Sequence, residues 1–327
     1  MSSGIISTDN EKRLVLVSGR GHPDLAQAVA DHLNCELIPT TAYDFANGEI
    51  YVQFGESVRG AFAFCLQSHT EPINQWIMEQ LIMIDALKRA SARTITVVAP
   101  FYGYARQDKK HRGREPISAR LLADLFRCAG ADRIMAVDLH TAQIQGFFNG
   151  PVDHLWALPL LANHVRSQVD RSRLTIVSPD AGRVRLADQW SDRLGAPLAI
   201  IHKRRNPAVP NEVKVHELVG EVEGRTCLIV DDMIDTASTI VKAADALFDN
   251  GAADVIVAAT HGVLSPPAVE RLEASRISQV VVTDTLPFNE DKRFSKLTVL
   301  SIAPLIARAI REIFDDGSVT SLFADGM

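Results

Sequence analysis

The alternation of short apolar runs with helix-patterned stretches constrains this chain more than any other feature of its sequence. The runs are rich in β-branched residues, and the stretches between them repeat their apolar residues at helical spacing. Strands that alternate with helices are typical of α/β proteins, in which mostly parallel sheets are flanked by helices in right-handed βαβ units. We expect strands at 14–17, 61–66, 95–99, 134–137, 174–177, 198–201, 227–230, 255–259, 280–282 and 297–302, and helices at 24–33, 72–90, 117–129, 158–169, 183–194, 237–249, 266–274 and 304–314.

Length and internal similarity both indicate two domains. At 327 residues the chain is longer than one hydrophobic core comfortably supports. The segment 130–134 leads through an apolar run to His140, and the similar segment 251–255 leads through another to His261. We interpret these halves as two related domains, 1–156 and 157–313.

Composition and charge exclude several classes of protein. The net charge of −6 argues against a nucleic-acid binder that works by bulk electrostatics. The four cysteines form no CxxC pair, so we expect buried free thiols in a reducing compartment. The polar N-terminus lacks the apolar core of a secretory signal, and no apolar run approaches the roughly 20 residues of a membrane span. We therefore expect a soluble, cytoplasmic protein without nucleic-acid or membrane partners.

The strongest local signal is the segment 227–239. An apolar strand is followed by Asp231 and Asp232, then by a short turn with hydroxyl side chains, and then by a helix. Backbone N–H groups at a helix start and threonine hydroxyls suit a phosphate, and paired carboxylates suit the hydroxyls of a ribose. The alternative is a plain capped helix start with Asp235 or Thr236 as N-cap, which leaves the paired acids unexplained.

Two basic segments and two polar strand ends are further candidates. The segment 106–114 contains five Lys or Arg residues and suits a triphosphate, although it could be a solvated charged loop. The segment 203–205 precedes two prolines and predicts a basic loop or a surface patch. His140 and Asp180 follow predicted strands, where open α/β sheets bind ligands. The helix at 72–90 is apolar on several faces, so it is either core or covered by another subunit.

These segments carry a resemblance to a known family. The segment 227–239 resembles the motif for phosphoribosyl pyrophosphate (PRPP) that phosphoribosyltransferases and PRPP synthetases share. The segments 45–49, 56–60, 79–88, 104–110, 114–119 and 138–148 resemble class I ribose-phosphate pyrophosphokinases, also called PRPP synthetases. The resemblance runs from about residue 14 to residue 323.

The resemblance implies a fold, a reaction and an assembly. The fold would be two phosphoribosyltransferase-like domains, with 314–327 returning to the first. The reaction would transfer the β,γ-diphosphoryl group of ATP to the anomeric hydroxyl of ribose 5-phosphate, giving AMP and the PRPP used in nucleotide, histidine and tryptophan biosynthesis. Family members form homohexamers with active sites at subunit interfaces, and a segment like 317–323 lies near their regulatory site for phosphate and ADP.

The resemblance also implies roles for particular residues. It places ATP against Phe45, Asn47, Glu49, Arg106 and Gln107, with Asn47 and Glu49 reaching across from a neighbouring subunit. It places magnesium or its water shell at His140 and Asp180, and a catalytic lid at Lys203 and Arg205. It places ribose 5-phosphate against Asp231, Asp232, Asp235, Thr236, Ala237, Ser238 and Thr239.

One departure from the family pattern leaves alternatives open. The family usually has glycine where this chain has Ser238. If position 238 requires positive φ, serine costs stability or affinity; if φ is helical, serine is tolerated. A catalytically silent regulatory homologue is one alternative, which retention of Lys203, Arg205 and the paired acids disfavours. A phosphoribosyltransferase would not need the segments around 47 and 106, and a non-enzymatic nucleotide-binding module would leave the basic loop unexplained.

Overall fold

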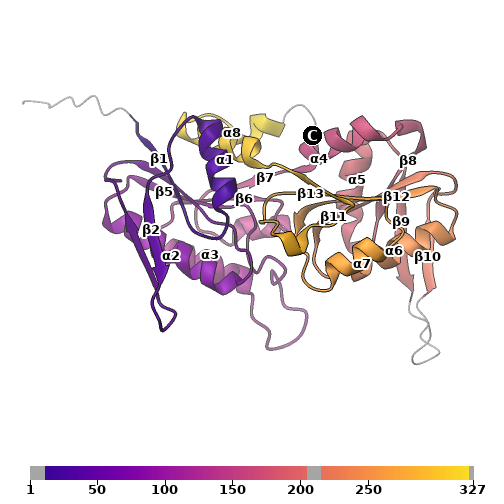
Figure 1. The fold of residues 1–327 in the computed structure, drawn as a ribbon, viewed down its shortest axis with the longest axis horizontal. Coiled ribbons are helices and arrows are strands. Elements are labelled where there is room, and N and C mark those ends of the chain that lie inside the picture. Colours follow the sequence, from indigo (N-terminus) through magenta and orange to yellow (C-terminus); the bar gives the residue numbers. More distant parts are fainter. Residues whose placement is uncertain (1–11, 205–214, 324–327) are drawn as a thin grey trace, which may run out of the picture.

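Two separate sheets organise the protein (Figure 1). The computed structural model describes residues 12–204 and 215–323. The five-stranded sheet is entirely parallel and has the order β1-β4-β5-β6-β7. Its strands are β1 (Leu14–Ser18), β4 (Phe62–Leu66), β5 (Thr94–Ala99), β6 (Arg133–Val137) and β7 (Val152–Leu155).

The seven-stranded sheet has the order β10-β9-β8-β11-β12-β13-β14. All its neighbours are parallel except β9 and β10, which are antiparallel. Its strands are β8 (Leu174–Ser178), β9 (Leu198–Arg204), β10 (Val215–Val219), β11 (Thr226–Ile234), β12 (Asp254–Gly262), β13 (Gln279–Thr283) and β14 (Leu297–Leu300). The prediction of an α/β fold with mostly parallel sheets is confirmed.

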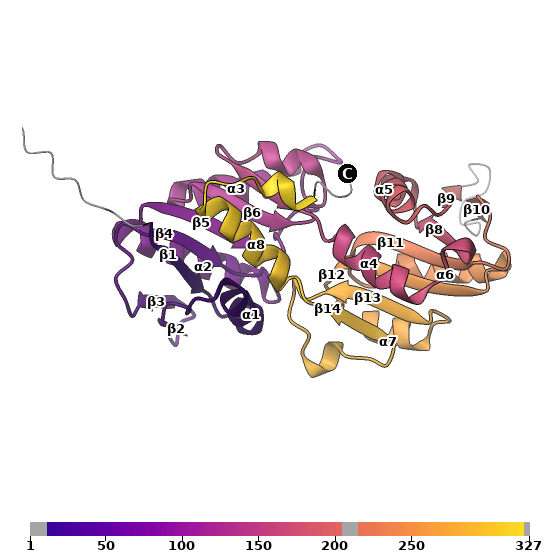
Figure 2. The ribbon, with the colours of Figure 1, turned by 90° about the horizontal axis from the view of Figure 1, so that it is seen from above.

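Helices occur where helical spacing predicts them and cover the faces of the sheets (Figure 2). Each expected helix has a counterpart within two residues at either end. They are α1 (Pro23–Leu33), α2 (Ile73–Arg89), α3 (Ser118–Ala129), α4 (Leu158–Gln168), α5 (Val184–Leu194), α6 (Ser238–Asp249), α7 (Ala268–Ala274) and α8 (Ala303–Phe314).

The C-terminal helix α8 lies against the N-terminal sheet rather than the sheet that precedes it. It packs on α1 and β7, and Ile306 and Ile310 on its inner face are wholly buried. The 3₁₀ turn Val319–Phe323 packs on α8 in turn. The domain limits 1–156 and 157–313 stay a prediction.

The structure adds strands that the apolar pattern does not predict. The most consequential are β2 (Thr40–Asp44) and β3 (Ile50–Phe54), an antiparallel hairpin outside both large sheets. The strand β11 is also longer than expected, because its pairing with β12 continues to Ile234 opposite Gly262. Asp231 and Asp232 therefore lie within a strand rather than beyond its end, which corrects the predicted arrangement.

Free thiols and membrane spans can be compared directly with expectation. All four cysteines are free, but only Cys65 and Cys227 are buried, whereas Cys128 is exposed.

Helix α2 buries Met83, Ile84 and Leu87 and exposes Met78. Among the residues that the structure describes, no helix is long and apolar enough to cross a bilayer.

Candidate active site

The carboxyl edges of the two large sheets face each other, and a set of polar contacts joins them. His261 Nε2, on β12, lies 3.1 Å from the carbonyl oxygen of Asp138, which follows β6. His22 Nε2 lies 2.9 Å from the carbonyl oxygen of Asp284, and the Ser68 hydroxyl donates to the carbonyl of Thr285. Since ligands of open α/β sheets bind beyond the carboxyl ends of strands, this junction is the expected place for a site.

Asp138 is the half-buried centre of this junction. Its Oδ2 accepts from Ala157 N at 3.0 Å and from Thr260 Oγ1 at 2.5 Å, so it ties β6 to α4 and β12. Its φ of 38° lies in the left-handed region, which asparagine and aspartate tolerate better than most residues. Burial raises the pKa of Asp138 to about 6.

Beside Asp138, four side chains form a compact charged cluster. Arg183 Nε lies 2.8 Å from Asp231 Oδ1, and Arg183 Nη2 lies 2.6 Å from Asp232 Oδ1. The second contact is an ion pair rather than a well-aligned hydrogen bond. His140 Nδ1 lies 2.7 Å from Asp232 Oδ2. The cluster thus joins His140 of the N-terminal sheet to the paired acids of β11.

The two acids of the cluster differ in acidity. Burial, and then the neighbouring carboxylate of Asp232, raise the pKa of Asp231 well above its usual range. Burial also disfavours the charged form of Asp232, but the hydrogen bond from His140 and the charge of Arg183 outweigh burial and hold its pKa at about 2. Asp232 is therefore the fixed anion of the pair.

His140 Nδ1 faces two groups with opposite hydrogen-bonding demands. It lies 2.7 Å from Asp232 Oδ2, which can only accept, and 2.9 Å from Arg183 Nη2, which can only donate. Both contacts are made by Nδ1 rather than by Nε2. A carboxylate behind a histidine in this way orients the other ring nitrogen toward a ligand.

The turn after β11 is built to receive an anion. Ala237 precedes the first residue of α6 with φ of 58°, and its side chain carries no capping group. The N-cap is therefore Ala237 rather than Asp235 or Thr236, which corrects the capped-helix alternative. The first N–H groups of a helix have no intrahelical partner and attract phosphate.

The strained position in this turn is Ala237 rather than Ser238. Ser238 begins α6 and shares its right-handed helical backbone. Of the two alternatives for position 238, the helical φ therefore holds, for which we expect serine to be tolerated.

A cavity of about 260 Å³ contains these groups. Arg106, from the loop between β5 and α3, enters it and donates from Nη1 to Asp235 Oδ2 at 2.5 Å. Burial opposes the charged form of Asp235, but Ser265 and Arg106 outweigh it and lower the pKa of Asp235. The lining residues are Arg106, His140, Arg183, Asp231, Asp232, Met233, Ile234, Asp235, Thr236, Ala237, Ser238, Thr239 and Ile240.

Other predicted residues lie outside this cavity in the described chain. Phe45, Asn47 and Glu49 are at the tip of the β2–β3 hairpin, where Asn47 Oδ1 accepts from Glu49 N at 3.1 Å. Phe45 is 46% exposed. Gln107 Oε1 accepts from the Ser118 hydroxyl at 2.6 Å, at the start of α3.

The predicted lid residues are described only in part. Lys203 is in β9, but the structure does not describe its side chain, and Arg205 lies outside the described residues. Asp180 caps a 3₁₀ turn through its bond from Gly182 N at 2.8 Å.

Sequence reasoning assigned no role in the site to Arg183, Thr260 or Asp138, although Asp138 and Thr260 directly follow the predicted strands 134–137 and 255–259. Arg183 belongs to a segment that the pattern marks as a polar turn, but its ion pairs with β11 depend on the tertiary fold. A single sequence gives no sign that Arg183 lies so close to the two acids predicted to bind the ligand.

The site offers few ligands for a resident metal ion. No cluster of three or more His, Cys, Asp or Glu side chains suited to a metal occurs in the residues that the structure describes. Magnesium usually keeps several waters and binds through one or two protein groups plus substrate phosphates. The available groups therefore fit a magnesium ion carried by a nucleotide better than an independent protein site.

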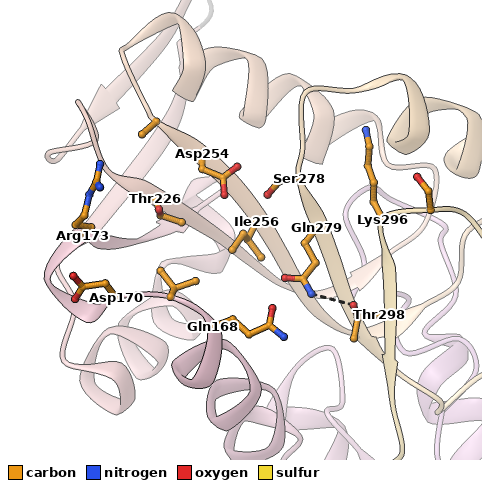
Figure 3. Close-up of a pocket in the computed structure, with 13 residues that line it drawn as sticks. Gln168, Asp170, Arg173, Thr226, Asp254, Ile256, Ser278, Gln279, Lys296 and Thr298 are labelled. Carbon is orange, nitrogen blue, oxygen red and sulfur yellow. Dashed lines mark hydrogen bonds between the residues drawn. The ribbon is translucent and has the colours of Figure 1, made fainter.

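A larger cavity of about 770 Å³ lies at the opposite, amino edge of the seven-stranded sheet (Figure 3). Thr226, Asp254 and Gln279 line it from the beginnings of their strands. Lys296 contributes no free cation there, since its ammonium group donates to the carbonyls of Leu272, Glu273 and Ser275. The Gln279 amide donates to the Thr298 hydroxyl at 3.0 Å. Among its described lining residues, Asp170 caps a one-turn 3₁₀ helix, and no α-helix begins there.

Paired acids, a helix start without a capping side chain and a converging arginine give this α/β protein a site with the chemistry to receive a sugar phosphate. Comparison with known proteins supports this interpretation. Residues 14–130 match the model of the N-terminal domain of ribose phosphate pyrophosphokinase, and residues 206–324 match that of the phosphoribosyl synthetase-associated domain.

Relatives resemble the chain over nearly its whole length. Ribose-phosphate pyrophosphokinase of Streptomyces coelicolor is 69% identical, over 97% of this chain and 98% of the relative. The Mycobacterium leprae protein of the same name is 61% identical, over 97% of each chain. The crystal structure of phosphoribosylpyrophosphate synthetase from Mycobacterium smegmatis superposes with a TM-score of 0.89 at 59% identity, covering 94% of this chain and 100% of that one.

The chain belongs to the ribose-phosphate pyrophosphokinase family. It is a transferase of nucleotide biosynthesis, as its motifs predict.

Proposed function

We propose that this chain joins ATP to ribose 5-phosphate within the cavity at the sheet junction. The anomeric hydroxyl oxygen attacks the β-phosphorus of ATP, and the bond from that phosphorus to the α-phosphate oxygen breaks. The hydroxyl proton is released to solvent, and AMP and PRPP are the products. The observation that carries this proposal is the presence of Arg106, the paired acids and the start of α6 in one cavity.

The sugar phosphate binds along β11 and the turn that follows it. Its 5-phosphate lies at the start of α6, where the N–H groups of Ser238 and Thr239 and the hydroxyls of Thr236 and Thr239 donate to it. Arg183 and the Asp232 N–H engage Asp231 Oδ1, so in the described structure Oδ2 is the oxygen left for a ribose hydroxyl. Asp232 acts mainly by holding His140 and Arg183.

ATP binds on the side of the cavity that Arg106 enters. Its triphosphate contacts Arg106, and Gln107 lies next along the same loop. Phe45, Asn47 and Glu49 read the adenine from a neighbouring subunit, since their hairpin tip is exposed on this one. Magnesium carried by ATP would neutralise phosphate charge, and His140 Nε2 and Asp180 are the groups that would hold it or its waters.

Lys203 and Arg205 stabilise the transferring group as a cationic lid. Diphosphoryl transfer requires mainly alignment and charge neutralisation, so cations placed near the β- and γ-phosphates are the principal protein contribution. This role rests on the family motif at 203–205, not on described side chains.

The experiment that tests the reaction is phosphorus NMR of the purified protein with ATP, magnesium and ribose 5-phosphate, with orthophosphate present as an activator. Equal appearance of AMP and PRPP, absent without the sugar phosphate, is the expected result. If neither product forms, the chain is a silent homologue.

The assembly is a homohexamer, and the cytoplasm is its location. Met78 on α2 and Leu121 and Leu125 on α3 are 52%, 59% and 42% exposed, which suits burial against another copy. Sedimentation velocity should give a species of six chains, and a stable monomer would contradict the assembly.

The cytoplasmic location is supported by the four free thiols, which suit a reducing compartment.

A further inference from the structure

Arg20 links the core of the N-terminal domain to the hairpin that carries Phe45, Asn47 and Glu49. It lies in the loop between β1 and α1, far in sequence from both of its acidic partners. One partner is Glu79 on α2 and the other is Asp44 at the end of β2. We propose that Arg20 is a positioning residue that fixes the hairpin tip for nucleotide binding, an inference that rests on the proposed role of that tip.

The core end of the link is a wholly buried carboxylate. Glu79 is 0% exposed, and it accepts from Arg20 N and Arg20 Nε, each at 2.6 Å. Gln67, also wholly buried, donates to Glu79 at 3.0 Å. A buried carboxylate held by three donors is a rigid anchor, because any displacement would leave its charge unpaired.

The loop around Arg20 is shaped to reach this anchor. Gly21 N donates to Gln67 Oε1 at 2.9 Å. A Cβ at Gly19 would clash with the Gln67 side chain, and a Cβ at Gly21 would clash with Gln67 and with the carbonyl of Ser68. The two glycines therefore allow the backbone to lie directly on Gln67, which aims the Arg20 side chain outward over α2.

The outer end of the link is the base of the hairpin. Arg20 Nη2 donates to Asp44 Oδ1 at 2.6 Å, while Gln75 Nε2 donates to Asp44 Oδ2 at 2.8 Å. The guanidinium also lies 5.5 Å from the centre of the Trp76 ring. Asp44 is the last residue of β2 and immediately precedes Phe45. Both oxygens of its carboxylate are therefore held in place one residue before the tip begins.

The hairpin needs such a link. It pairs with neither large sheet, and a two-stranded ribbon is at best marginally stable by itself in water. Packing of β3 on α2 holds one strand, since Val52 and Phe54 contact the core. The Arg20–Asp44 pair holds the other strand where it enters the tip.

The test compares two variants of the link with a matched control in the purified full-length enzyme. Arg20→Ala removes the link and leaves the Glu79 carboxylate without a cation, so its fold must be checked by thermal unfolding. Asp44→Ala removes the outer contact, together with the hydrogen bond from Gln75, and leaves Glu79 with Arg20. The control is Arg89→Ala, which removes an exposed i,i+4 pair with Asp85 on the same helix α2.

We expect both link variants to raise KM for ATP about tenfold, the effect of one charge-assisted hydrogen bond. KM for ribose 5-phosphate and kcat at saturating ATP should stay within about twofold of wild type, as should every parameter of the control. The double variant should raise KM for ATP by less than the product of the two single increases, because both changes remove the same Arg20–Asp44 contact. Equal changes in both KM values, or none, would overturn the proposal.

A readout without substrate separates this inference from the proposed reaction. Amide hydrogen exchange at residues 45–49 should be faster in Arg20→Ala and Asp44→Ala than in wild type, and unchanged in Arg89→Ala. If wild type makes no PRPP, the proposed reaction fails while exchange still tests the link. If the amide exchange rates at residues 45–49 were the same in the link variants as in wild type, the proposed role of Arg20 would be wrong even if the enzyme is active.

Discussion

Arg106 Nη1 lies 2.5 Å from Asp235 Oδ2, so a residue proposed to hold ATP touches the turn proposed to hold ribose 5-phosphate. The two residues come from different sheets and are 129 positions apart in sequence. Their contact means that the two proposed substrate sites adjoin each other. A change at this pair should therefore be felt by both substrates.

Arg106→Ala should lower kcat/KM for ATP and for ribose 5-phosphate by about a hundredfold each. The guanidinium offers both a phosphate contact and an anchor for the sugar-phosphate turn, and the loss of a charged contact in a reacting site costs about 3 kcal/mol. Initial rates with each substrate varied in turn measure the effect. Arg120→Ala, which removes the exposed pair with Asp124 on α3, is the control. An effect on ATP alone would mean that the Asp235 contact has no part in sugar binding.

The sequence predicts the two large sheets better than it predicts the hairpin. Strands such as β5 and β12 are mostly apolar and are buried at every position but the first, as strands covered on both faces are. In β2, Thr40–Asp44 is mostly exposed or half-exposed, so it has no apolar alternation to signal a strand. Its stability comes from β3, α2 and Arg20, and none of these partners is visible locally.

The same distinction applies to the site. The acids and hydroxyls of 231–239 are contiguous, so their chemistry can be predicted from one segment. Arg183 joins the site because β8, which precedes it, pairs with β11, and Thr260 meets Asp138 because the two sheets meet edge to edge. The extent of β11 was also unpredictable from its own residues, because β12 provides the pairing that carries it through Asp231.

Ala237→Gly should stabilise the protein by about 0.5–1 kcal/mol. A left-handed alanine costs about 1–2 kcal/mol, and the greater freedom of glycine in the unfolded chain offsets part of the gain. Urea unfolding of both proteins measures the difference. Ser238→Gly is the matched control, and since Ser238 is already helical it should bring no gain in stability and no tighter binding of ribose 5-phosphate. If Ser238→Gly stabilised the protein instead, the backbone strain would be at Ser238 rather than at Ala237.

Asp138→Asn should flatten the dependence of stability on pH between about 4 and 6. Burial raises the pKa of folded Asp138 to about 6, above its ordinary value of 3.8. Over this window the folded state keeps a proton that the unfolded state loses, so wild-type stability falls as pH rises. Two pKa units correspond to about 3 kcal/mol. Asparagine keeps an acceptor for Ala157 N and Thr260 but does not titrate.

The measurement for Asp138 is urea unfolding at pH 4.5, 5.5 and 6.5 for wild type and variant. Asp245→Asn, an exposed change on α6, is the control and should retain the wild-type slope. The assignment fails if Asp138→Asn also retains that slope.

Lys203→Ala should lower turnover at least about a hundredfold and leave the affinity for ribose 5-phosphate nearly unchanged. A cation that meets the transferring group mainly in the transition state contributes to kcat, whereas the proposed sugar-phosphate site is at β11 and α6 rather than on β9. Turnover is followed as AMP release at saturating substrates, and affinity by calorimetric titration of ribose 5-phosphate. Lys242→Ala, an exposed lysine on α6, is the matched control for loss of one positive charge. Near-wild-type turnover would remove Lys203 from the mechanism, and an equal loss of sugar-phosphate affinity would make it a binding residue instead.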